Sequence, residues 1–168
     1  ENREEIYKLE LLMKQAESTE TSRKCTAAAR AVAEKTGQSG AAAELADGTV
    51  ITGKTSSLLG CISATLINCL KHLAGIDDDI LLIGPDVIKP IQELKVKYLG
   101  NKNPRLHSDE VLIALTISAR TDKNAAAAVA QLSNLKNCEM HSTVLLSHVD
   151  ENVLKKLGMR LTCEPENK

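Results

Sequence analysis

Residues 48–55 read GTVITGKT, which spells the pattern of a phosphate-binding P-loop: a glycine, four residues, then Gly, Lys and Thr. A working P-loop needs a strand before its first glycine and a flexible bend through the four variable residues, so that successive backbone N–H groups point at one phosphate. Here these four residues, 49–52, are all β-branched, and such side chains favour an extended strand. We therefore interpret the stretch as a strand and not as a P-loop.

The residues that end this stretch are nevertheless candidates for binding an anion. Lys54, Thr55 and Ser56 come directly before a segment in which leucine and isoleucine recur at helical spacing. Free N–H groups at a helix start, together with the helix dipole, attract negative charge, and Lys54 would add a cation. In the alternative interpretation, Thr55 or Ser56 only caps the helix and Lys54 is solvated.

A second polar cluster occupies residues 103–110, NPRLHSDE. Arg105 and His107 precede Ser108, which we expect to cap a helix. A guanidinium, an imidazole that titrates near neutral pH and free helical N–H groups would form an anion pocket, with His107 as the residue that moves protons in catalysis. Alternatively, this loop only shapes a turn and Ser108 only caps. Our central hypothesis is that the two polar clusters face each other across one pocket.

His141 is a weaker third candidate for the wall of this pocket. It opens the run HSTVLLS, which is typical of a strand, and the alternative is a surface histidine. Cys138 lies three residues earlier, but a zinc site needs two such pairs, so we expect no metal here. The five cysteines include no C-x-x-C pair, which favours reduced thiols in a cytoplasmic protein.

The elements that must position these residues alternate between helices and short apolar strands. Asp47-Gly48 is a strong β-hairpin signal, and Gly37 and Gly100 are typical of positions that follow a helix. We expect helices at 3–17, 22–35, 53–75, 85–100, 108–119, 123–135 and 150–158, and strands on both sides of residues 47–48 and at 80–83, 141–147 and 159–164. The β-branched content of 108–119 leaves a strand there as the alternative. This order predicts an α/β fold: a three-layer domain with a mixed or mostly parallel sheet at 38–168, preceded by a helical hairpin at 1–37.

The composition limits the classes of partner. The 168 residues carry a net charge of −1, and only 1% of them are aromatic. Nothing in that charge favours nucleic acid or an anionic membrane, and there are no aromatic platforms for stacking bases. No apolar run approaches the roughly 20 residues of a membrane span. The chain opens on ENREEIY, already in helical rhythm and without an initiator methionine, so we expect a piece of a longer protein.

The stretches ELADGTVITGKTSSLLG, LKHLAGIDDDI, IKPIQELKVKYLG, NPRLHSDEVLIAL and HSTVLLSHVDENVLKKLGMRLTCEP together resemble the C-terminal part of a bacterial family without an assigned role, the domain of unknown function 1846. The resemblance covers nearly all of the chain. It implies an intact protein about three times longer, whose N-terminal part carries its own G-x-G-x-G-K loop. No substrate comes with the family.

These observations lead to two hypotheses. In the first, Lys54, Thr55, Ser56 and Arg105, with His141 as a further wall, bind a nucleotide or phosphorylated metabolite beside His107, and catalysis needs the N-terminal part. In the second, the chain is a homo-oligomerisation module in which both polar clusters only cap helices. In either case we expect a homo-oligomer that contacts the N-terminal part of the longer protein.

Overall fold

A computed structural model describes residues 23–165, so the helix expected at 3–17 lies outside the described part. Four strands form one mixed sheet in the order β2-β1-β3-β4, with β1 (Gly40–Glu44), β2 (Val50–Lys54), β3 (Glu139–Ser142) and β4 (Arg160–Cys163). β1 is antiparallel to both β2 and β3, while β3 and β4 are parallel. The predicted α/β class with a mixed sheet is confirmed.

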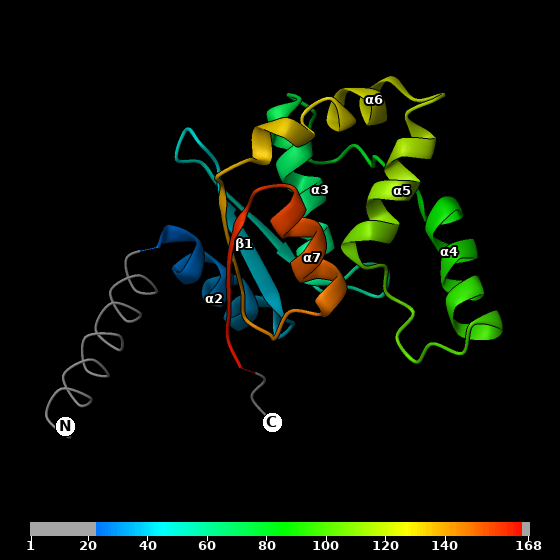
Figure 1. The fold of residues 1–168 in the computed structure, drawn as a ribbon, viewed down its shortest axis with the longest axis horizontal. Helices are drawn as coiled ribbons and strands as arrows, with labels where there is room; N and C mark the ends of the chain where they lie inside the picture. Colours follow the sequence, from blue (N-terminus) through cyan, green and yellow to red (C-terminus); the bar gives the residue numbers. More distant parts are fainter. Residues whose placement is uncertain (1–22, 166–168) are drawn as a thin grey trace, which may run out of the picture.

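Helices cover both faces of this sheet (Figure 1). On one face lies α2 (Lys24–Thr36), whose Cys25 and Ala29 pack against Ala42 of β1. Ala41 and Ala43 point to the opposite face, because successive side chains of a strand alternate, and they join the main core with α3 (Cys61–Leu73). The second helix of the predicted lead-in is therefore a layer of the domain, and it ends at Gly37 (φ 69°), as predicted.

The hairpin between β1 and β2 confirms the strand interpretation of the GTVITGKT stretch. Gly48 has a φ of 85°, and the Asp47 carboxylate accepts the N–H of Thr49 at 2.9 Å. Gly53 packs against α3 so closely that a Cβ there would lie 2.5 Å from both the backbone N and Oγ1 of Thr65. This glycine permits close packing of a helix on a strand; it does not form a phosphate loop.

The structure differs from the sequence expectation at one helix start and at two expected strands. The first is the start of α3, at Cys61 and not at 53. Residues 55–60 form a loop because Ser56 Oγ accepts the N–H groups of Leu58 and Leu59, each at 3.2 Å, and these local bonds replace helical ones.

The other two are strands. Residues 80–83 form no strand: Leu82 and Ile83 are buried without pairing, because a short apolar run needs burial but not a sheet neighbour. In place of the strand expected at 141–147, the structure has β3, which begins at Glu139 and ends at Ser142. There Ser142 Oγ bonds both the N–H and the carbonyl of Val144, which turns the chain out of the sheet.

The remaining helices lie on the α3 side of the sheet or beyond it (Figure 1). They are α4 (Pro85–Glu93), which continues into a π-helical turn η1 (Leu94–Tyr98), then α5 (Ser108–Ser118), α6 (Lys123–Val129), the 3-10 turn η2 (Leu132–Leu135) and α7 (His148–Lys156). Gly100, with a φ of 74°, follows the α4–η1 helix as expected. Within residues 23–165 no helix combines the length and apolar character needed to cross a bilayer.

Candidate functional site

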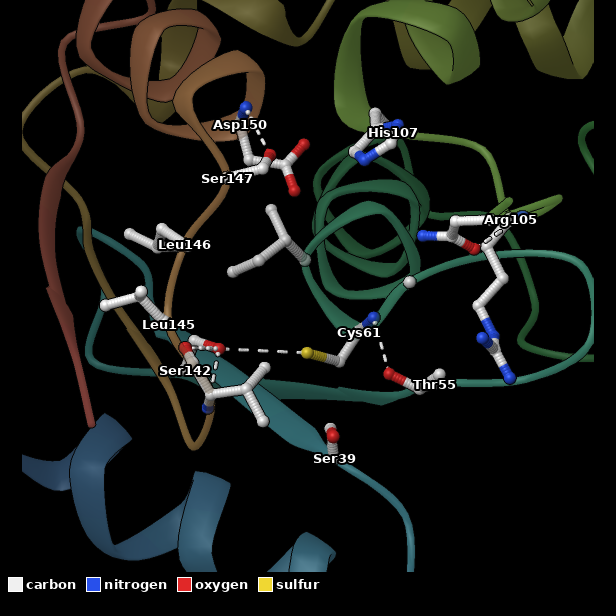
Figure 2. Close-up of a pocket in the computed structure, with 14 residues that line it drawn as sticks. Ser39, Thr55, Cys61, Arg105, His107, Ser142, Leu145, Leu146, Ser147 and Asp150 are labelled. Carbon is white, nitrogen blue, oxygen red and sulfur yellow. Dashed lines mark hydrogen bonds between the residues drawn. The ribbon is translucent and has the colours of Figure 1, made fainter. Parts of the chain in front are cut away.

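A cavity of about 530 Å³ lies at the end of the sheet where β1 begins and where β2 and β3 end. Figure 2 shows its walls: Arg105 and His107 on one side, Asp150 and Ser147 on another, and Leu145 and Leu146 beside them. The complete lining consists of Ser39, Thr55, Gly60, Cys61, Ile62, Asn103, Arg105, His107, Ser142, Val144, Leu145, Leu146, Ser147 and Asp150.

Three helices begin at this cavity. The residues that cap them at the N-terminus are Gly60 for α3, His107 for α5 and Ser147 for α7, and all three belong to the lining. A helix start carries roughly half a unit of positive charge, since its first N–H groups have no partner within the helix. The positive ends of three helix dipoles therefore point at the same space, which the Asp150 carboxylate also lines.

The loops that carry the two polar clusters lie side by side on one wall of this cavity and do not face each other across it, and of the first cluster only Thr55 joins the lining. Arg105 Nε donates to the carbonyl oxygen of Ser56 at 2.6 Å, and the N–H of Leu106 donates to the carbonyl of Leu58 at 3.0 Å. Among the described residues, Nη1 and Nη2 of Arg105 have no hydrogen-bond partner, so both remain free for a ligand. Thr55 joins the same wall and caps α3 across the loop, because its Oγ1 accepts the Cys61 N–H at 3.1 Å.

A buried lysine supports the Arg105–His107 wall from behind. Lys95 of η1 is only 2% exposed, and its Nζ donates to the Arg105 carbonyl at 2.6 Å and to Glu110 Oε1 at 2.7 Å. The same Nζ lies 3.4 Å from His107 Nδ1, so this ring nitrogen faces the interior and Nε2 is the ring atom left for a ligand.

Glu110 stabilises this arrangement as an anion. Its Oε1 accepts the backbone N–H of His107 at 2.9 Å. Burial by itself would raise the pKa of Glu110, but the hydrogen bonds from Lys95 and from His107 outweigh it and hold the pKa below its ordinary value. The Glu110 carboxylate therefore stays charged near neutral pH, and its bonds to Lys95 and His107 fix the position of the loop that carries Arg105.

Asp150 ties the starts of α5 and α7 together. Its Oδ1 accepts both the N–H and the hydroxyl of Ser108, at 2.9 and 2.7 Å, while its own N–H donates to Ser147 Oγ at 3.1 Å. Its second carboxylate oxygen has no hydrogen-bond partner within residues 23–165. Asp150 thus lines the cavity with an acceptor that is available to a ligand hydroxyl.

The thiol of Cys61 also borders the cavity, 3.8 Å from Ser142 Oγ. Burial raises its pKa above the ordinary value, although hydrogen bonds from Ser142 and Thr55 act in the opposite direction. The thiol is therefore protonated at neutral pH, which agrees with a packing role and not with an activated nucleophile.

The structure does not bring the other predicted residues into this cavity. Lys54 is exposed at the end of β2 and is not part of the lining, and Ser56 contributes its carbonyl to Arg105 but not its hydroxyl. His141 is fully buried on the α2 face of the sheet, opposite to the neighbouring Ser142. Its ring nitrogens are occupied, with Nδ1 2.6 Å from Thr162 Oγ1 and Nε2 3.1 Å from Glu164 Oε2.

Sequence reasoning missed Lys95 and Asp150. Lys95 lies two residues before the exposed Lys97 in LKVKY, and nothing local marks it as buried. Asp150 had a usable signal, because Ser147 followed three residues later by an acid is the pattern of a helix N-terminal capping box.

Comparison with known proteins gives a family but no reaction. The model of the family described as "Domain of unknown function DUF1846, C-terminal" matches residues 21–168. UPF0371 protein cu0538 of Corynebacterium urealyticum is 54% identical over 156 residues, which cover 93% of this chain and 31% of that protein. UPF0371 protein stu1377 of Streptococcus thermophilus is 52% identical over 160 residues, which cover 95% and 32%. This chain spans less than a third of the length of these curated relatives.

Proposed function

This chain belongs to the family of the domain of unknown function DUF1846, C-terminal, and we propose that its cavity binds a small phosphorylated metabolite or a nucleotide. The chain would supply the binding site for the anionic group. Any catalysis would use groups from the remainder of the longer protein, since the relatives are about three times the length of this chain.

The charge distribution around the cavity supports a phosphate ligand. Three helix starts and the Arg105 guanidinium face the same space, and the planar guanidinium suits two parallel hydrogen bonds to phosphate oxygens. The Nε bond to Ser56 holds this side chain in place before a ligand arrives, and the Lys95 bond to the carbonyl of Arg105 holds the backbone that carries it. Less conformational freedom is then lost on binding.

The rest of the lining supports a ligand whose body carries hydroxyl groups. The free oxygen of Asp150 and the hydroxyls of Ser39 and Ser147 offer hydrogen-bonding groups, and Val144 to Leu146 form an apolar wall. A bare inorganic anion would gain nothing from Asp150, whose negative charge opposes it. A sugar phosphate or nucleotide uses both parts of the cavity.

His107 would contact the phosphate through Nε2. Because Nδ1 lies against Lys95 and Glu110, the ring is oriented by groups that do not face the ligand. In the neutral tautomer with Nε2 protonated, the ring donates one hydrogen bond, and in the imidazolium form it adds a positive charge. This is the residue through which a proton would pass if the site performs acid–base chemistry.

The proposal rests on one observation, the convergence of three helix starts and Arg105 on one cavity. Its test is calorimetric titration of the protein with ribose 5-phosphate, AMP and inorganic phosphate, repeated with Arg105→Ala. Losing a charge-assisted hydrogen-bond pair is worth roughly 1.5–3 kcal/mol, so affinity should fall about 10- to 150-fold. Lys54→Ala is the matched control, because it removes a nearby cation outside the cavity.

Equal losses of affinity in the Arg105 and Lys54 variants would refute the assignment of the site, since only a diffuse charge effect would remain. The absence of any heat or thermal stabilisation with all three ligands at millimolar concentration would remove the binding function itself. The second hypothesis, a homo-oligomerisation module, stays a prediction, which the mass of the protein in solution by light scattering tests.

A further inference from the structure

The described chain concentrates its exposed apolar side chains in one part of the fold, on and beside α4, η1 and α5. Of nine large apolar side chains that are exposed within residues 23–165, seven lie on or next to α4, η1 and α5, and the other two lie near the cavity. The seven are Leu81, Leu94, Val96, Tyr98, Leu99, Ile113 and Ile117, and we refer to them as the α4–η1–α5 surface. Soluble proteins rarely leave so many large apolar residues together without a partner.

Helical geometry explains why this surface is uncovered. In the α4–η1 helix, Ile88 and Lys95 point towards the body of the domain and are buried. Leu94 and Tyr98 are four residues apart and share one side of the helix, and Leu99 follows one π turn after Leu94, where its N–H donates to the Leu94 carbonyl at 3.0 Å. The apolar face of this helix is therefore wider than the body of the domain covers, and these three side chains remain exposed.

α5 extends the same surface. Glu110, Ile113 and Ile117 occupy one stripe of α5, and Glu110 holds Lys95 of η1 in an ion pair at 2.7 Å. Ile113 and Ile117 therefore lie on the side of α5 next to the α4–η1 helix, as the neighbouring positions of α4 and α5 in Figure 1 indicate. They are 60% and 62% exposed.

Tyr98 adds the chemistry of an interface. It is the only aromatic residue of the described chain, and it is 68% exposed, with Lys97 Nζ 5.4 Å from its ring centre. Tyrosine is enriched at protein interfaces and among the residues that dominate their binding energy. It also lies in a π-helical turn, a local deviation that is frequent at functional positions.

We infer that the α4–η1–α5 surface docks against the polypeptide that precedes this domain in the full-length protein. The matching family model is that of a C-terminal domain, and the chain covers only 31% and 32% of two relatives, so a segment about twice its length belongs to the same polypeptide. A tethered segment reaches the surface at a high effective concentration, which gives it an advantage over a second copy. The inference does not depend on the proposed ligand.

Docking at this surface would place the preceding polypeptide directly behind the cavity wall. Lys95, on the buried side of η1, bonds the carbonyl of Arg105 and approaches His107. A partner that fixes η1 from outside therefore also fixes the loop of residues 101–107. The remainder of the protein can then influence the site without entering the cavity.

The test is hydroxyl-radical footprinting of the full-length protein, read by mass spectrometry. The reporter is Leu99, which is 64% exposed in this domain. Its rate is normalised to that of an exposed leucine in a short peptide. We expect Leu99 to be labelled at least fivefold more slowly than that peptide, independently of protein concentration.

Labelling of Leu99 at the rate of the free peptide would overturn the inference. Protection that vanishes on dilution would also overturn it, because the occupant would then be a second copy. A second measurement uses Leu99→Asp in the full-length protein, with Val149→Asp as control, since Val149 is exposed and does not line the cavity. Since Leu99 is largely exposed, the variant domain still folds, and we expect release of the domain as faster proteolysis between it and the preceding polypeptide. An unchanged rate of proteolysis in Leu99→Asp would contradict docking at this surface.

Discussion

Replacing the buried lysine behind the cavity tests how the Arg105–His107 wall is held. Lys95→Met keeps most of the side-chain volume but removes the ammonium that joins η1 to α5. The Arg105 carbonyl then loses a hydrogen bond of 2.6 Å, and the Glu110 carboxylate loses its only lysine partner in the described chain. The loop that carries Arg105 and His107 should become less ordered as a result.

The magnitude follows from burial. Breaking a buried ion pair by removing one partner costs roughly 3–5 kcal/mol. The side chain of Glu110 is 24% exposed, so water can solvate part of the orphaned carboxylate, and we expect about 3 kcal/mol. For a domain of this size this corresponds to a decrease of roughly 6–12 °C in melting temperature.

Lys97→Met is the matched control, since it makes the same substitution two residues away. The side chain of Lys97 is 64% exposed, and its Nζ lies 3.6 Å from Glu93 Oε1 on the helix surface. Exposed pairs of this kind contribute at most about 0.5 kcal/mol. The contrast between the two variants separates the buried ion pair from the general loss of a positive charge.

The assay is urea unfolding at several pH values. The pKa of Glu110 is lowered in the folded state, so its contribution to stability is present above the ordinary pKa of 4.5 and is lost as the pH falls through the folded-state pKa. The difference in the free energy of unfolding between wild type and Lys95→Met should therefore be largest near pH 7 and should shrink at pH values below 4.5. In Glu110→Gln, the same lysine substitution should cost less than in the wild type.

Two results would refute this reasoning. One is a cost for Lys95→Met no larger than that for Lys97→Met, which would mean that the buried pair contributes nothing net. The other is a cost that stays constant from pH 7 to pH 3, because the stabilising partner would then not be an ionised carboxylate.

Three further outcomes are expected. Thr55→Val should lower the free energy of unfolding by about 1 kcal/mol in urea titrations, because the N–H of Cys61 at the start of α3 loses its acceptor. Gly53→Ala should cost about 1–3 kcal/mol by the same measurement, since the added Cβ would lie 2.5 Å from the backbone of Thr65. Burial raises the pKa of the Cys69 thiol to about 12, so native protein at pH 8 should leave it unmodified by an aromatic disulfide reagent while unfolding should make it react within minutes.

Each of these has a control within the chain. Valine keeps the shape of threonine but lacks the hydroxyl, whereas serine keeps the hydroxyl. Thr55→Ser should therefore retain most of the stability that Thr55→Val loses, and equal losses in both variants would contradict the capping argument. At Gly60 an added Cβ meets nothing within 4 Å, so Gly60→Ala should be tolerated where Gly53→Ala is not. Cys163 is only partly buried, and it should be modified faster than Cys69 in the folded protein.

The sequence determined those features that depend on a few neighbouring residues. Asp47-Gly48 required a turn, and the β-branched residues after it required a strand, so the P-loop spelling could be rejected without a structure. Gly37 and Gly100 marked helix ends because a left-handed backbone conformation is easily adopted only by glycine. The α/β class followed from the order of such local signals.

Only the tertiary structure decided which of these residues share a site. Arg105 and the Ser56 carbonyl are 49 positions apart in the chain and come within 2.6 Å of each other. Lys95 and Lys97 look alike in sequence, yet one is buried behind the cavity and the other is in solvent. His141 and Ser142 are adjacent, yet only Ser142 faces the cavity. Local propensity acts over a few residues, whereas the direction and burial of a side chain depend on elements packed against it from elsewhere in the chain.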